Sequence, residues 1–163
     1  MLPFLLLGLV GAFLIYYATA WGPWAFSDAT GYITAARNLV AGHGIGAFDP
    51  SGRFSPGVSH PPLYVLALGA VSLLGLEPLQ AARAQDILLF GLLVAACGVM
   101  LCRVLGSRGA GLAFSALLLV HPALLIAFTS AMAEPPFILL GLLSLLFLAD
   151  YLREPRSATF LAG

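Results

Sequence analysis

Residues 84–104 read AQDILLFGLLVAACGVMLCRV, and the middle of this segment, between Asp86 and Arg103, carries no charged side chain. A bilayer core of about 30 Å is crossed by about 20 helical residues, so the segment is typical of a transmembrane helix. Similar apolar runs occupy residues 1–21, 109–128 and 135–152. The chain is therefore predicted to be an all-α integral membrane protein, a polytopic bundle of about four transmembrane helices.

The composition of the chain favours the same class. Of its 163 residues, 61% are hydrophobic and only 9% are charged, and the mean hydropathy is +1.01. Soluble domains carry about 25% charged residues, so this chain has too few to cover a water-facing surface. The net charge is zero and lysine is absent, which argues against a nucleic-acid partner. Cys97 and Cys102 fall on different faces of one predicted helix, so no disulfide is expected between them.

Arginine pairs orient the predicted helices. Arg103 and Arg108 flank one short connection, and Arg153 and Arg156 follow the last apolar run. Because cytoplasmic loops are enriched in arginine, both pairs are assigned to the cytosol. The connection at residues 129–134 then lies on the outer side of the membrane.

The same orientation of the helices places residues 22–83 on the outer side of the membrane as one long segment. Its second half contains a marginal apolar run at residues 61–76, which cannot span and is predicted to be an interfacial helix. The alternative, five true spans, would leave one arginine pair on the outer side. Trp21 and Trp24, at the start of the segment, suit an interfacial aromatic belt.

The other interfacial helix predicted in this segment covers residues 28–41. Apolar side chains share one helical face, and polar side chains share the opposite face. The apolar face has Tyr32, Ala36, Leu39 and Val40, and the polar face has Thr34, Arg37 and Asn38. A turn-rich stretch, AFDPSGRFSPG, connects this helix to the second one.

The ends of the sequence allow two further expectations. Ala18-Thr19-Ala20 resembles a signal-peptidase site, but no basic residue precedes the first apolar run, so a retained membrane anchor is favoured over a cleaved signal. Residues 153–163 are expected to begin a continuation, which would make this chain the N-terminal part of a larger protein.

Two carboxylates are the candidate catalytic residues. Asp28 begins the first interfacial helix, and Glu134 directly precedes Pro135-Pro136 and the last span. The predicted orientation of the helices brings both to the outer face of the membrane, where a pair of acids can activate a hydroxyl nucleophile or hold a divalent cation. The simpler interpretations are an N-cap for Asp28 and a favourable helix-dipole interaction for Glu134.

Three other polar positions each allow two interpretations. Arg83, at the outer end of the second span, could bind a phosphate or pair with Asp86. His60, before a Pro-Pro pair, could contact a substrate or metal, although an ordinary loop histidine is the simpler interpretation. His121, before Pro122, predicts a helix kink in which the imidazole bonds a freed carbonyl.

Three motifs carry a resemblance to a known family. SDATGYITAARNLVAGHG (residues 27–44), SHPPLY (59–64) and AEPPF (133–137) follow one another in the order found in GT-C fold glycosyltransferases. The pattern is similar to the protein O-mannosyltransferase and lipid A aminoarabinose transferase group, the family 39 type. This resemblance implies a polyprenyl-phosphate sugar donor and transfer to an acceptor hydroxyl on the outer face of a bacterial plasma membrane.

The resemblance also implies roles for single residues. Asp28 and Glu134 correspond to the catalytic acids of the first and second outer loops, and His60, Arg83 and Tyr32 are expected to contact substrate. Many members carry two adjacent acids in the first loop, whereas here Ala29 follows Asp28. A divalent cation therefore remains only an option for the site. The other functional classes are a secondary transporter and a non-catalytic membrane assembly subunit.

The predicted orientation can be tested with single cysteines. Ser55→Cys and Thr129→Cys should react with an impermeant thiol reagent from outside the cell, and Ser107→Cys should not, because the arginine pairs fix the inner side. Labelling of Ser107→Cys in sealed cells would contradict the orientation.

Overall fold

The structure, a computed structural model, describes residues 1–57 and 61–153. This part of the chain is mostly helical, in agreement with the predicted all-α class, and also contains one short two-stranded sheet. The elements are α1 (Leu2–Ala18), α2 (Ser27–Val40), β1 (Gly46–Phe48), β2 (Phe54–Pro56), α3 (Pro62–Ser72), α4 (Pro78–Leu105), α5 (Arg108–Leu119), α6 (Pro122–Phe128) and α7 (Glu134–Arg153).

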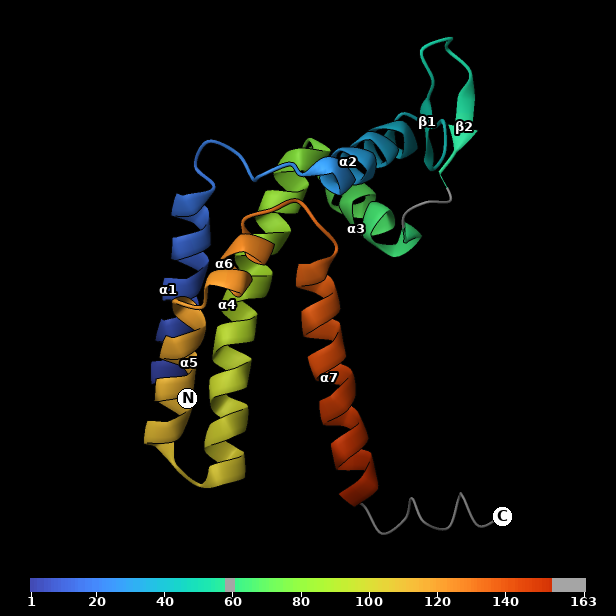
Figure 1. Cartoon of the computed structure of the whole chain (residues 1–163). Coiled ribbons are helices and arrows are strands. Elements are labelled where there is room, and N and C mark those ends of the chain that lie inside the picture. Colours follow the sequence, from blue (N-terminus) through green and yellow to red (C-terminus); the bar gives the residue numbers. More distant parts are fainter. Residues whose placement is uncertain (58–60, 154–163) are drawn as a thin grey trace, which may run out of the picture.

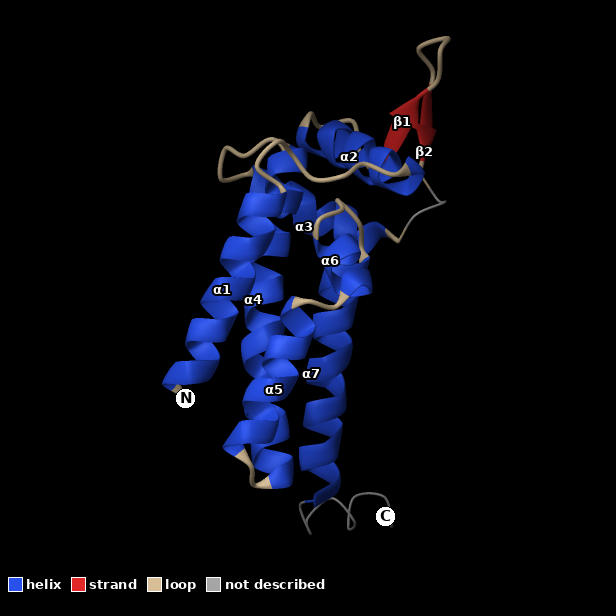
Figure 2. Cartoon of the chain, turned by 60° about the vertical axis from the view of Figure 1, so that its left-hand side comes forward, coloured by secondary structure: helices blue, strands red, loops and turns tan. Residues whose placement is uncertain are grey.

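The helices form a lengthwise bundle with a cap across one end. The helices α1, α4, α5 and α7 run along the bundle, and α2 and α3 cross its upper end (Figure 1). The antiparallel hairpin β1–β2 projects beyond α2. We call α2, the hairpin and α3 the cap. Met1 and the end of α7 both lie away from the cap (Figures 1 and 2).

The helix α4 is shared by two apolar clusters. Near the cap, Ala81 and Ala82 pack in a cluster that includes Leu68 of α3. Further along, Phe90 and Val94 pack in a second cluster with residues of α1, α6 and α7. The inward face of α4 therefore joins the cap to the bundle.

Two glycines allow α1 to approach α4 closely. A Cβ atom at Gly8 would lie 2.7 Å from the carbonyl oxygen of Gly91, and one at Gly91 would lie 2.9 Å from that of Gly8. Real Cβ atoms do not approach backbone oxygens so closely, so the contact requires glycine on both helices. This packing fixes α1 along the length of α4.

The predicted span at residues 109–128 is not one helix. It breaks at His121-Pro122 into α5 and α6, whose axes differ by 61°. Proline cannot supply an N–H to the preceding turn, which explains the position of the break. The kink is therefore present, but the expected imidazole–carbonyl bond is not found among the described residues, and His121 is exposed.

The lengths of the helices differ from the four predicted spans. Only α4, with 28 residues, is by itself long and apolar enough to cross a membrane, and α5 with α6 would be a second such span if the bent pair is counted as one. Within residues 1–57 and 61–153, the other apolar helices fall short of the same criterion. The apolar run at residues 1–21 predicted a longer first helix than the structure has, because α1 ends at Ala18.

The end of α3 and the start of α4 also differ from expectation. The helix α3 ends at Ser72, not at residue 76, and a turn follows in which Gly75 has a φ of +90°. The helix α4 then begins at Pro78, where the Glu77 carboxylate accepts a hydrogen bond from the Leu79 N–H at 2.8 Å. As a result, Arg83 lies within α4 and not ahead of it.

Candidate functional site

A short backbone bridge joins the two connections that precede α2 and α7. The Trp24 N–H donates to the Thr129 carbonyl at 2.8 Å, and the Ala131 N–H donates to the Trp24 carbonyl at 3.0 Å. Trp24 and Ser130 form an isolated parallel β-bridge through these two bonds. The bridge holds the beginning of α2 close to the beginning of α7.

Asp28 is the second residue of α2, and its side chain is exposed. The N-cap is Phe26, which makes no side-chain cap bond, so the interpretation of Asp28 as the N-cap is wrong. The helix begins one residue earlier than predicted, and this moves Asp28 into the first turn. Its Oδ1 accepts a hydrogen bond from the Ser27 hydroxyl at 3.4 Å. The carboxylate is therefore free of any helix-capping bond.

Glu134 is the first residue of α7 and is exposed. Pro135 and Pro136 follow it in the first turn, where proline is well tolerated because those N–H groups have no partner in the helix. An acid at this position interacts favourably with the helix dipole, as the simpler interpretation expects. That interaction leaves the carboxylate oxygens able to accept hydrogen bonds.

Tyr32 lies within electrostatic reach of both acids. Its side chain is buried, at 7% exposure, and meets the ring of Tyr64 edge-on, with ring centroids 5.0 Å apart. Burial raises the pKa of Tyr32, and the charges of Glu134 and Asp28 raise it further. The structure thus gathers Asp28, Tyr32 and Glu134, three of the five predicted site residues, at one place.

The packed face of α2 agrees with the sequence at most positions. Tyr32 and Ala36 are buried, and Leu39 is partly buried against the same cluster. Val40 is exposed and was wrongly assigned to this face. The buried face holds Tyr32 toward α3 and leaves Asp28 exposed.

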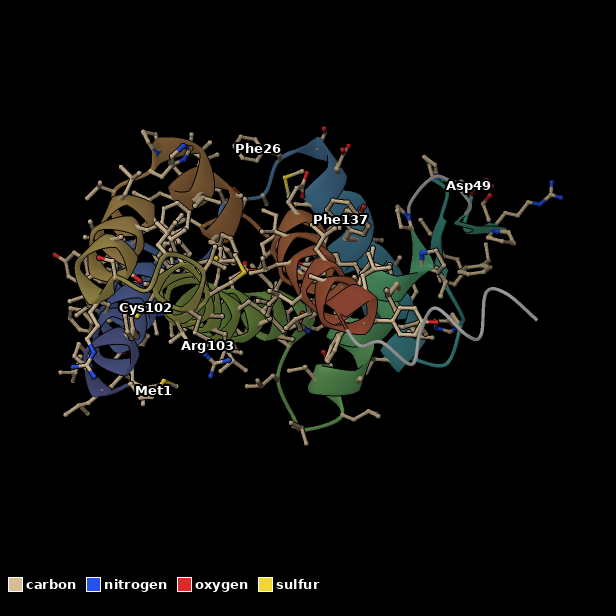
Figure 3. The ribbon with its side chains drawn as sticks, turned by 90° about the horizontal axis from the view of Figure 1, so that it is seen from below. Met1, Phe26, Asp49, Cys102, Arg103 and Phe137 are labelled. Atoms are coloured by element: carbon tan, nitrogen blue, oxygen red, sulfur yellow. The ribbon has the colours of Figure 1, made fainter. Side chains whose placement is uncertain are left out.

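A groove of about 640 Å³ runs between α3 and α7 beside these residues. Among the described residues that line it, Glu134 is the only charged one, and Tyr64 belongs to the same wall. The apolar lining includes Leu63 and Ala67 of α3 and Phe137 and Leu140 of α7. Figure 3, which views the molecule from the end opposite the cap, shows the position of Phe137 on α7. Glu134 therefore lies in the wall of a largely apolar groove, and Asp28 is not among the residues that line it.

The side chain of Arg83 is directed toward α1. Its Nε donates to the Thr19 hydroxyl at 3.1 Å, its Nη2 donates to the Tyr16 carbonyl at 3.1 Å, and the guanidinium stacks over the Tyr16 ring. The predicted pair with Asp86 is absent. Arg83 faces α1, which separates its side chain from the groove lining.

Asp86 is a buried acid that the sequence suggested only as a partner for Arg83. Its side chain is 0% exposed, and both carboxylate oxygens lack a hydrogen-bond partner among the described residues. Tyr64, 2% exposed, also has an unpartnered hydroxyl there. Burial raises the pKa of Tyr64, and the charge of Asp86 is the next contribution. An acid inside an apolar run was the available sequence signal.

The remaining predicted site features concern His60 and a metal ion. His60 lies outside the described residues. In the part of the chain that is described, no three His, Cys, Asp or Glu side chains are grouped so that they could hold a metal ion.

No family model, curated protein or solved structure matches the chain. The roles that the GT-C resemblance implies for Asp28, Glu134 and Arg83 accordingly stay predictions. What the geometry contributes independently is the clustering of both acids around Tyr32.

This clustering predicts the titration of Tyr32. Glu134→Gln and Asp28→Asn should each lower the pKa of Tyr32 toward the usual value of about 10, with the larger effect from Glu134, because each removes a negative charge that opposes phenolate formation. Burial persists in both variants, so neither should restore the usual value fully. NMR of ¹³C-labelled tyrosine, assigned with Tyr32→Phe, measures the shift. Asp49→Asn in the hairpin is the control, and an unchanged Tyr32 pKa in both site variants would contradict the clustering.

Proposed function

We propose that the chain carries the acidic site of a membrane glycosyltransferase. It transfers a sugar from a polyprenyl-phosphate donor to an acceptor hydroxyl on the outer face of a bacterial plasma membrane. The observation that supports this most is that Asp28 and Glu134 both lie within electrostatic reach of Tyr32, with Glu134 in the wall of the apolar groove. Such a site suits a substrate that combines an apolar chain with a reacting polar group.

The exposed surface supports a multi-pass membrane protein. Large apolar side chains stand exposed along α1 and α7, for example Leu9, Phe13, Leu145 and Phe147. Continuous apolar faces of this kind are rare on soluble monomers and are stable against lipid tails. Trp24, exposed near the cap, suits the membrane interface.

The positions of the arginines support an outward-facing cap. Arg103 and Arg108 lie at the connection between α4 and α5, at the end of the bundle opposite the cap. Arginine-rich ends of membrane helices face the cytosol. Asp28 and Glu134 then lie at the outer membrane surface, where a membrane-anchored donor and an acceptor can meet.

The transfer step needs a base for the acceptor. One of the two carboxylates accepts the proton of the acceptor hydroxyl while its oxygen forms a bond to the anomeric carbon. The bond from that carbon to the phosphate oxygen breaks, and the polyprenyl phosphate leaves with the electron pair. General-base assistance of this kind contributes roughly 10²–10⁴-fold to the rate. The second carboxylate orients the hydroxyl and stabilises positive charge that develops on the sugar.

The leaving phosphate needs a cationic partner, and Arg83 is proposed for this role. Guanidinium groups have five N–H donors, and Arg83 uses two of its N–H groups toward α1. Its remaining donors suit a phosphate oxygen. His60 stays a proposed substrate contact through the HPP motif.

Asp86 favours a second candidate function, secondary transport. A buried acid without a partner in a helix that can span a membrane is typical of proton or ion pathways. The break between α5 and α6 fits the interrupted helices of transporters. Under this alternative, Asp86→Asn should abolish ion-coupled uptake, and Asp28→Asn should have little effect.

The transferase proposal predicts a specific loss of activity in the full protein. Asp28→Asn and Glu134→Gln should each reduce transfer from a labelled polyprenyl-phosphate sugar by about 10²-fold or more, with normal abundance in the membrane. Each change keeps the side-chain size and removes the basic oxygen. If the acids act together, the double variant should lose little beyond the worse single variant.

Asp49→Asn provides the matched control, since it makes the same chemical change in the hairpin, away from the groove. It should transfer at the native rate. Full activity in both Asp28→Asn and Glu134→Gln would rule out the proposed catalytic roles.

A further inference from the structure

We propose that the groove between α3 and α7 binds the acceptor, and that this acceptor is an amphipathic molecule with an apolar chain and an uncharged hydroxyl head. The identification of this ligand as the acceptor rests on the proposed transfer reaction. The chemistry of the ligand rests on the groove alone.

The walls of the groove suit an apolar chain. Its volume of about 640 Å³ lies in the roughly 300–1,000 Å³ range of ligand pockets. The lining continues along α7 from Glu134 through Phe137 to Ser144, a rise of about 15 Å along the helix. A chain lying along α7 would therefore contact apolar side chains over most of its length, with its polar end near Glu134.

The polar end of the groove suits a hydroxyl. Glu134 offers carboxylate oxygens, which accept hydrogen bonds. Tyr64 contributes to the same wall, but its hydroxyl oxygen is buried. An alcohol at this end of the groove can therefore donate its hydroxyl proton to Glu134.

The charges in this region disfavour a phosphate. Among the described residues, no arginine lines the groove, and Glu134 contributes a carboxylate to it. Arg37 is paired with Glu77 at 2.7 Å, and Arg83 is not among the described residues that line the groove. A phosphate head in the groove would meet a carboxylate without a compensating cation. The groove therefore matches the acceptor and not the anionic donor.

A photolabelling experiment tests this assignment with the full protein in nanodiscs. The probe is dodecanol carrying a diazirine on its chain, and the competitors are dodecanol and dodecyl phosphate. Labelling is expected on α3 and α7, and dodecanol should compete at least ~10-fold better than dodecyl phosphate, a difference of about 1.4 kcal/mol. Equal or better competition by dodecyl phosphate would overturn the proposal.

Filling the groove provides a second readout. A Cβ atom at Gly141 would meet nothing within 4 Å, so Gly141→Leu should fold normally and occupy the groove that it lines. It should reduce labelling at least ~10-fold. The matched control is Gly109→Leu, an exposed helical glycine of α5 outside the groove, which should label like the native protein. Undiminished labelling in Gly141→Leu would overturn the site.

Changing the charge at the groove tests the basis of selectivity. Glu134→Gln should reduce the preference for the alcohol, and Glu134→Arg should reverse it in favour of dodecyl phosphate. An unchanged preference in Glu134→Arg would contradict the role of this carboxylate. Because binding is measured without transfer, alcohol binding in a protein that shows no transfer would contradict the proposed function and leave this inference standing.

Discussion

The arrangement of the site depends on the backbone bridge between Trp24 and Ser130. Its two N–H···O bonds connect chain segments that are distant in sequence and that lead directly into α2 and α7. Each such bond contributes only about 0.5–1.5 kcal/mol net, but a buried N–H or carbonyl left without a partner costs more. The bridge is thus the arrangement that satisfies both connections. Asp28 and Glu134 follow it closely in sequence and are brought to one site by it.

The helix α4 supplies the rigid support beneath this site. Its inward face carries Ala82 in the cap cluster, Asp86 one turn later, and Phe90 in the bundle cluster. Asp86 therefore lies where the two clusters meet. The Arg83 guanidinium is held against α1 by its bonds to Thr19 and Tyr16.

Much of the fold could be predicted from the sequence because apolar runs and arginine positions are strong signals in a chain with few charges. They predicted α4 and the location of Asp28 and Glu134 toward the same end of the molecule. They did not predict the N-cap at Phe26 or the end of α3 at Ser72, because tertiary packing decides such boundaries. The partner of Arg83 could not be predicted either, since Thr19 and Tyr16 lie far from it in sequence. The groove depends on the relative tilt of α3 and α7, which no local pattern encodes.

The central claim is that the segments leading into α2 and α7 lie together, and pulsed EPR tests it most directly. Spin labels at Ser27→Cys and Phe137→Cys, with both native cysteines replaced by alanine, report the separation in nanodiscs. A single narrow distance distribution well below the bilayer core of about 30 Å is predicted. The control pair, Ser27→Cys with Ser107→Cys, should give a longer distance, because α4, with a length of about 42 Å, separates the cap from residue 107. A distance of about 30 Å or more between residues 27 and 137 would contradict a shared site.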